Sequence, residues 1–234
     1  MSMNANVLPR SGLIGSAANS AAPPRESVVR EVHGWNPETF GREQIRGLVR
    51  RVFFTNTEAP VKQVVFSAIE WSTEVGDICF RVGHALALET SAEIAIVSRN
   101  SHATDIVDAQ HYPHYSGTRG VKSRSTQLAK NLWHVPEPGL HELCPEPAID
   151  RCWPWALGEL RKNFEYAVIQ GSSAGASSES GFLGQLADGI ILVVEADSTR
   201  KATARKIKEM LEATQSRILG TVLSQRTFPV PEKI

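Results

Sequence analysis

The residues best placed for phosphate chemistry lie between Gln63 and Leu88. The pattern there is a short apolar strand, a polar loop and a helix with one apolar face, which is the strand–loop–helix layout that P-loop proteins use to hold a triphosphate. The apolar positions that define this layout are Val64, Val65 and Phe66 in the strand and Ile78, Val82, Ala85 and Leu86 in the helix.

The loop of this layout lacks the groups that phosphate binding needs. A working P-loop uses several glycines, a lysine and a neighbouring Ser or Thr, but the loop 67–77 has one glycine, and no lysine occurs from Gln63 to Val121. The carboxylates of Glu70, Glu74 and Asp77 stand where a polyanion would lie and would repel it. The sequence therefore predicts a degenerate phosphate site at Ser67, Ser72, Thr73, Glu74, Val75 and Gly76.

Two further predicted strands also end without catalytic groups. The strand 92–97 is followed by Ser98-Arg99-Asn100, which offers no acid for Mg²⁺ or water. The strand 164–169 leads into Gln170 and a G-x-S-x-G string, which resembles a nucleophile elbow. That interpretation requires a histidine later in the chain, and the last one is His141. A Ser/Gly-rich loop is therefore predicted.

No metal site is predicted. Five of the seven histidines lie in the segment 101–147. The pairs His111-x2-His114 and His141-x2-Cys144 have acceptable ligand spacings, but neither belongs to the compact four-ligand pattern of a structural zinc site. The segment is interpreted as a loop-and-helix insert.

Composition argues against nucleic-acid and membrane-spanning functions. Lys+Arg and Asp+Glu both number 25, so no overall field attracts a polyanion. The three cysteines form no CxxC pair, which favours a reducing cytoplasm. No apolar run approaches the ~18 residues of a membrane span, and the first residues lack a signal-peptide core. We therefore expect a cytoplasmic protein without direct membrane insertion, associated with a membrane only through a partner.

The first helix is predicted to begin at Asn36-Pro37-Glu38, where Asn caps and Pro fits the first helical position. It follows a leader, residues 1–30, whose composition predicts disorder. Arg42, Arg46 and Arg50 lie opposite the apolar stripe of this helix, and they form either a solvated face or a docking surface. The stripe consists of Ile45, Leu48, Val49, Val52 and Phe53.

The last third of the chain predicts a strand 190–194, a helix 199–215 capped by Ser198, and a strand 218–223. In that helix Ala204, Ile207 and Met210/Leu211 are expected to face the core. Repeated strand–helix–strand units imply a single α/β domain, residues 31–234, with a mostly parallel sheet flanked by helices.

With these residues in view, the chain resembles the cytoplasmic ATPase module of bacterial tyrosine kinases of the capsule and exopolysaccharide type. These modules form a branch of the MinD/ParA-like P-loop NTPase fold. The resemblance covers residues 40–226. It rests on GREQIRGLVRRVFFTNTEAPVKQVVFSA, on FEYAVIQGSSAG and on LADGIILVVEADSTRKATARKIKEMLEATQSRILGTVLSQ.

The chain departs from this family at each position where the family binds phosphate or metal. The family's Walker A Lys and Ser/Thr fall on about Val75 and Gly76, its second acidic motif on Ser98 and Asn100, and its Walker B Asp on Gln170. Its Glu-x2-Arg-x2-Arg oligomerisation motif is approximated by Glu43, Arg46 and a displaced Arg50. The family's C-terminal tyrosine cluster is absent, since the tyrosines are Tyr112, Tyr115 and Tyr166.

The resemblance and these departures together imply a catalytically inactive, kinase-like protein with no catalytic residue, cofactor or metal. It would regulate or scaffold exopolysaccharide biosynthesis or export. Its expected partners are a membrane polysaccharide co-polymerase, an active homologue or a second copy of itself, through Glu43, Arg46 and Arg50, and not nucleic acid.

Two alternatives stay open. The chain could bind ATP and Mg²⁺, as an ATPase or tyrosine kinase, through replacement groups such as Arg81, Arg99 or Lys122. It could also be a MinD- or ParA-like positioning protein, which would call for an amphipathic membrane helix or a basic DNA face. The segment 227–234 predicts no such helix.

Overall fold

The structure is a computed structural model that describes residues 36–55, 58–99, 120–145 and 149–225, with the backbone alone for 149–151. The predicted leader, Asn100 and the His111/His114 pair lie outside the described residues.

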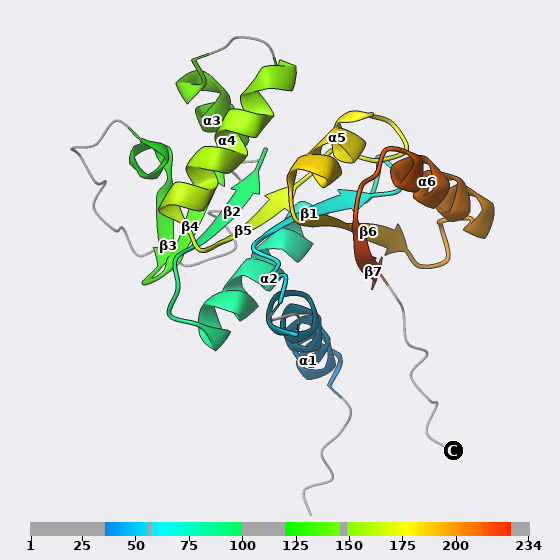
Figure 1. Ribbon diagram of the computed structural model, residues 1–234. Helices are drawn as coiled ribbons and strands as arrows, with labels where there is room; N and C mark the ends of the chain where they lie inside the picture. Colours follow the sequence, from blue (N-terminus) through cyan, green and yellow to red (C-terminus); the bar gives the residue numbers. More distant parts are fainter. Residues whose placement is uncertain (1–35, 56–57, 100–119, 146–148, 226–234) are drawn as a thin grey trace, which may run out of the picture. The chain divides into compact units, whose positions relative to one another are not determined.

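A seven-stranded sheet forms the centre of the described domain, in the order β3-β4-β2-β5-β1-β6-β7 (Figure 1). Every neighbouring pair is parallel except β3 with β4. The predicted single α/β domain with a mostly parallel sheet is thus confirmed. The strands are β1 (Gln63–Ala68), β2 (Ile94–Ser98), β3 (Thr126–Ala129), β4 (Leu132–Pro136), β5 (Tyr166–Gln170), β6 (Gly189–Glu195) and β7 (Ile218–Ser224).

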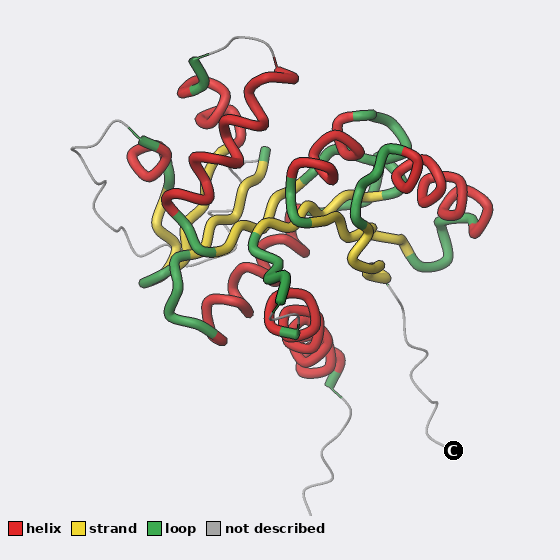
Figure 2. Tube along the Cα trace, in the orientation of Figure 1, coloured by secondary structure: helices red, strands yellow, loops and turns green. Residues whose placement is uncertain are grey.

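Helices cover both faces of this sheet (Figures 1 and 2). One face packs against α1 and α2 through a core that includes Val49, Leu86 and Phe66. The other packs against α3 to α6 through a core that includes Trp153 and Leu183. Strands buried on both faces read as continuous apolar runs because neither face meets water. The helices are α1 (Pro37–Val49), α2 (Gly76–Glu89), α3 (Glu137–Leu143), α4 (Ile149–Asn163), α5 (Glu179–Leu186) and α6 (Lys201–Ala213), with a π-helical turn η1 (Arg50–Phe54) and a 3₁₀ turn η3 (Val121–Arg124).

Helix α1 begins where its cap predicts. The Asn36 side chain accepts hydrogen bonds from the backbone N–H groups of Glu38 and Thr39, and Pro37 occupies the first turn. In the predicted apolar stripe Val49 and Phe53 are buried, and the other members pack partly buried against the same core.

The predicted boundaries of the last helix were wrong in part. Helix α6 begins at Lys201, so Ser198 is not its cap; the preceding residue, Arg200, makes no side-chain cap bond. Asp197 adopts a left-handed backbone, φ 63°, which extends the turn after β6 and delays the helix. Ile207 and Leu211 are buried as predicted, but Met210 is 41% exposed because it lies off that face.

The insert 101–147, interpreted from the sequence as loop and helix, also contains two strands that the sequence patterns did not indicate. Its described part forms β3, β4 and α3, and β4 extends the parallel sheet beside β2. The five-residue strand LWHVP is short and carries a histidine, so periodicity could not identify it. The His134 ring is buried and hydrogen-bonded to Ser98, 2.9 Å between Oγ and Nε2.

Candidate functional site

The predicted strand–loop–helix layout is confirmed: β1 ends at Ala68, and α2 begins at Gly76. In parallel α/β sheets, ligand sites lie outside the carboxyl ends of the strands. The loop 69–75 lies at that edge, where the Thr73 hydroxyl donates to the Glu195 carboxylate, 3.2 Å, at the end of β6. The carboxyl edge of β1, β5 and β6 is therefore the candidate site.

The loop is closed against its neighbours by the chain itself. The backbone N–H of Gly175 and the hydroxyl of Ser173 both donate to the Ile69 carbonyl at 3.1 Å. The Ser67 hydroxyl, fully buried, donates to the Ser172 carbonyl at 2.6 Å and contacts the Ser180 hydroxyl at 3.0 Å. These bonds use polar groups that could otherwise contact a phosphate.

The residues at the predicted phosphate positions do not converge on a ligand. Val75, at about the lysine position, is 4% exposed and belongs to the core against α2. Ser72 and Glu74 are exposed, whereas Thr73 is buried. An anion at this loop would meet no cationic side chain from the loop 69–75.

Gln170 points at the start of α2 from the end of β5. Its side-chain oxygen lies 3.5 Å from where a Cβ on Gly76 would stand. This oxygen is buried and has no hydrogen-bond partner among the described residues. A neutral amide supplies no charge to hold Mg²⁺, which prefers carboxylates and phosphate oxygens. Gln170 therefore does not supply the carboxylate that a Mg²⁺–nucleotide complex would use at the end of β5.

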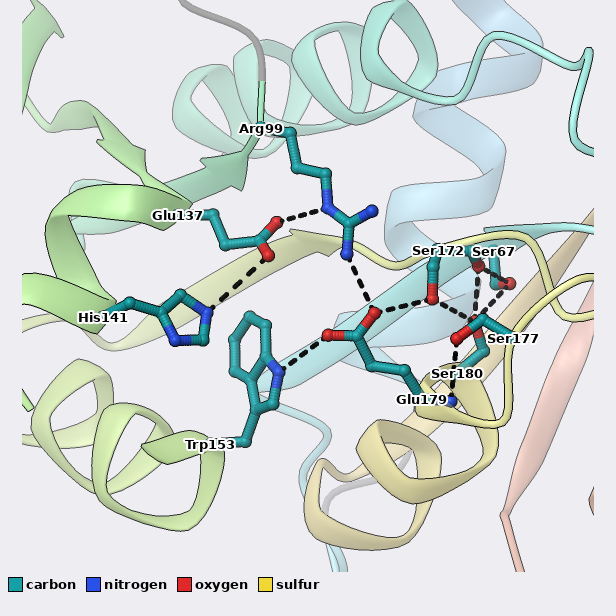
Figure 3. Close-up of polar contacts among 9 residues, drawn as sticks. All are labelled: Ser67, Arg99, Glu137, His141, Trp153, Ser172, Ser177, Glu179 and Ser180. Carbon is teal, nitrogen blue, oxygen red and sulfur yellow. Dashed lines mark hydrogen bonds and ion pairs between the residues drawn. The ribbon is translucent and has the colours of Figure 1, made fainter. Parts of the chain in front are cut away.

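Arg99 lies at the same edge, at the end of β2, and two carboxylates of the chain neutralise it (Figure 3). Its Nε lies 2.9 Å from Glu137 and its terminal nitrogen 2.8 Å from Glu179. Both acids occupy the first position of a helix, α3 and α5, where the helix dipole favours negative charge. The guanidinium thus joins β2, α3 and α5.

Glu179 is the most connected member of this cluster. Its carboxylate accepts hydrogen bonds from the indole N–H of Trp153, 3.0 Å, and the hydroxyl of Ser172, 2.8 Å. Burial raises the pKa of Glu179, but the bonds from Trp153 and Ser172 and the charge of Arg99 outweigh it, so the pKa lies below its ordinary value. Burial lowers the pKa of Arg99. The hydrogen bonds and charges of Glu137 and Glu179 raise it by more, so the pKa lies above its ordinary value.

The sequence alone did not identify Glu137, Trp153 or Glu179 as members of the site. The sequence offered one indirect signal. A cation at a strand end, Arg99, is expected to pair with an acidic side chain at the same edge of the sheet. The His141 ring lies 3.7 Å from Glu137 and stacks edge-on against Trp153 (Figure 3). Among the described residues, no three His, Cys, Asp or Glu side chains are grouped to hold a metal.

The other replacement cations lie elsewhere. Arg81 pairs with Asp77 within α2, at 2.8 Å. Lys122 lies 3.4 Å from Glu93, which precedes β2, and over the ring of Phe164, which precedes β5. That is the amino edge of the parallel strands, opposite the candidate phosphate position.

The predicted docking residues are engaged within the chain. Arg50 donates to Glu89, the last residue of α2, at 2.9 Å, and Arg46 approaches the same carboxylate at 3.5 Å. Arg46 also pairs with Glu43 at 3.1 Å. These side chains connect α1 to α2, and they remain 45 to 61% exposed.

The described residues contain no helix that is long and apolar enough to cross a bilayer. No protein-family model matches the chain, and no curated protein matches it.

Solved structures do match. The kinase domain of the Escherichia coli tyrosine kinase ETK is 13% identical, with TM-score 0.61, covering 82% of this chain and 80% of that one. The VpsO kinase domain is 19% identical, with TM-score 0.57, covering 81% and 98%. A ParA family ATPase from Chlorobium tepidum is 10% identical, with TM-score 0.54, covering 73% and 76%. The chain therefore has the fold shared by bacterial tyrosine kinase domains and MinD/ParA-type P-loop ATPases.

Proposed function

We propose that this chain is a catalytically inactive, tyrosine-kinase-like protein that regulates or scaffolds exopolysaccharide biosynthesis or export. The observation that carries the proposal is the neutralisation of Arg99 by Glu137 and Glu179 at the carboxyl edge. Together with the buried Val75 and the neutral Gln170, it means that these three described positions offer neither a free cation nor a carboxylate of the kind that phosphoryl transfer uses. The protein would then act through contacts that its surface makes with partners, and not through chemistry at the site.

The partner that fits this proposal is a membrane polysaccharide co-polymerase or an active homologue, with self-association as a further mode. The protein would be cytoplasmic and would reach the membrane through that partner. The tyrosine kinase domains among the structural neighbours support this choice through fold.

Calorimetric titration of the purified protein with ATP and ADP, with and without Mg²⁺, tests the inactivity. We expect no heat at millimolar nucleotide and no change in thermal unfolding. A site with micromolar affinity would be evident, because ligand at 100 times its Kd stabilises a fold by about 2.7 kcal/mol.

Micromolar binding that depends on Mg²⁺ would overturn the proposal. In that case Arg99→Gln and Arg81→Gln, compared with Lys122→Gln as a control at the amino edge, would show which cation replaced the lysine.

A further inference from the structure

Helix α6 carries a basic face on the outside of the domain. Ile207 and Leu211 bury the inner side of the helix against the sheet. The exposed side chains on and beside it include five cations: Arg200, Lys201, Arg205, Lys206 and Lys208.

Four of these five cations have no ion-pair partner among the described residues, whereas most described Lys and Arg side chains elsewhere do. Elsewhere, cations typically meet carboxylates, as in Lys62–Glu165 at 2.6 Å and Arg161–Asp188 at 2.9 Å. On α6 only Lys208 does so, with Glu212 at 2.9 Å. Within the described residues, no carboxylate lies within ion-pair distance of Arg200, Lys201, Arg205 or Lys206.

The placement of two of these cations is unfavourable for the helix itself. Arg200 precedes the first helical residue, Lys201, and the first turn contains no acid. The amino end of a helix carries partial positive charge, so cations there repel it and anions stabilise it. An external anionic surface would relieve this repulsion.

We propose that the basic face of α6 binds the anionic surface of a phospholipid membrane peripherally, by electrostatic attraction without insertion. Clusters of four to eight Lys or Arg on an amphipathic helix are suited to such surfaces. Met210, 41% exposed, is an apolar side chain on the same helix. This direct contact would act in addition to the route through a partner. It goes beyond the proposed function, because it needs neither the phosphate site nor a protein partner.

A membrane fits this face better than a nucleic acid does. Asp197, Glu209 and Glu212 lie among the cations and would meet phosphates that a duplex holds at fixed positions. Lipids in a fluid bilayer can instead redistribute, so that anionic headgroups gather at the cations and leave the carboxylates.

The test is sedimentation of the full chain with vesicles of phosphatidylcholine alone or mixed with phosphatidylglycerol, at low and high salt. We expect binding to the mixed vesicles at low salt and loss of it at high salt. The variant Arg205→Glu/Lys206→Glu should bind at least about tenfold more weakly. The control Arg51→Glu/Lys130→Glu changes the net charge equally at exposed cations outside α6 and should bind like the unaltered protein.

Absence of binding to the mixed vesicles at low salt would overturn the proposal, as would equal weakening in both variants. Binding to duplex DNA that depends on Arg205 and Lys206, without vesicle binding, would assign the face to nucleic acid instead. Thermal unfolding of both variants establishes that they fold. Because nucleotide titration is a separate measurement, either proposal can fail without the other.

Discussion

At the scale of single residues, one carboxylate connects several elements at the carboxyl edge of the sheet. Glu179 joins Arg99, Trp153 and Ser172, and so ties the end of β2 to α4, α5 and the loop after β5. With 20% of its side chain exposed, it is sufficiently buried for these bonds to matter.

The variant Glu179→Gln tests this role. It keeps the shape of the side chain but removes the charge that Arg99 and two donors require, so we expect a loss of about 1–2 kcal/mol in the free energy of unfolding. Urea denaturation measures it. Glu212→Gln removes an exposed ion pair on α6 and should change stability by less than about 0.5 kcal/mol. Equal losses of stability in the two variants would mean that Glu179 contributes no more than an exposed ion pair does.

At the scale of elements, two close approaches hold the degenerate loop and α1 in place. The loop after β5 passes so near the β1 loop that a Cβ on Gly175 would lie 2.4 Å from the Ile69 carbonyl oxygen. Arg50 reaches from η1 to the end of α2.

Gly175→Ala should separate the two loops, because backbone atoms cannot yield as a flexible side chain can. We expect a destabilisation of about 1–3 kcal/mol, measured by thermal or urea unfolding. Gly158→Ala in α4, where nothing lies within 4 Å of the new Cβ, should be neutral or stabilising by up to about 1 kcal/mol. An unaffected Gly175→Ala protein would mean that the loops are not held together.

A charge swap separates the internal and external roles of Arg50. Arg50→Glu should cost about 1 kcal/mol, since it places a carboxylate beside Glu89, and Arg50→Glu/Glu89→Arg should recover most of that. If the arginines also dock a partner, association measured by light scattering or pull-down stays lost in the swapped variant. Recovery of both properties would make the contact purely internal.

At the scale of the whole molecule, acid should weaken the fold through His134 and Glu179. Burial lowers the pKa of His134 from 6.5 to about 4. As the pH falls, the unfolded chain therefore takes up a proton at His134 before the folded chain does. The stability that depends on the neutral ring is complete above pH 6.5 and is lost as the pH falls toward 4. The pKa of Glu179 is also lowered, so its contribution is present above the ordinary carboxyl pKa and is lost as the pH falls and the carboxylate becomes protonated.

Denaturation at a series of pH values measures this dependence. The gap between 6.5 and about 4, at about 1.36 kcal/mol per pH unit, predicts a loss of about 3 kcal/mol. His134→Gln should flatten the curve between pH 6.5 and 4.5. His84→Gln, at an exposed position of α2, should leave it unchanged. A flat curve for the unaltered protein would contradict the prediction.

The sequence by itself determined the class of fold and the β1–loop–α2 layout. Both follow from local patterns, namely apolar periodicity and the Asn36 cap, which need no knowledge of distant contacts. The composition of the loop 67–77, with one glycine and no lysine, is also a property of the sequence alone. The strand β4 was not predictable, because its burial comes from pairing with β2 and not from its own pattern.

Only the tertiary structure decided which residues meet at the carboxyl edge. Arg99, Glu137 and Glu179 are far apart in sequence and come together because parallel strands deliver their ends to one edge. It also decided that Arg46 and Arg50 meet Glu89. On α6 it paired Lys208 with Glu212 and left Arg205 and Lys206 without a carboxylate among the described residues. Charge pairing depends on distances across the fold, and residue types alone do not contain those distances.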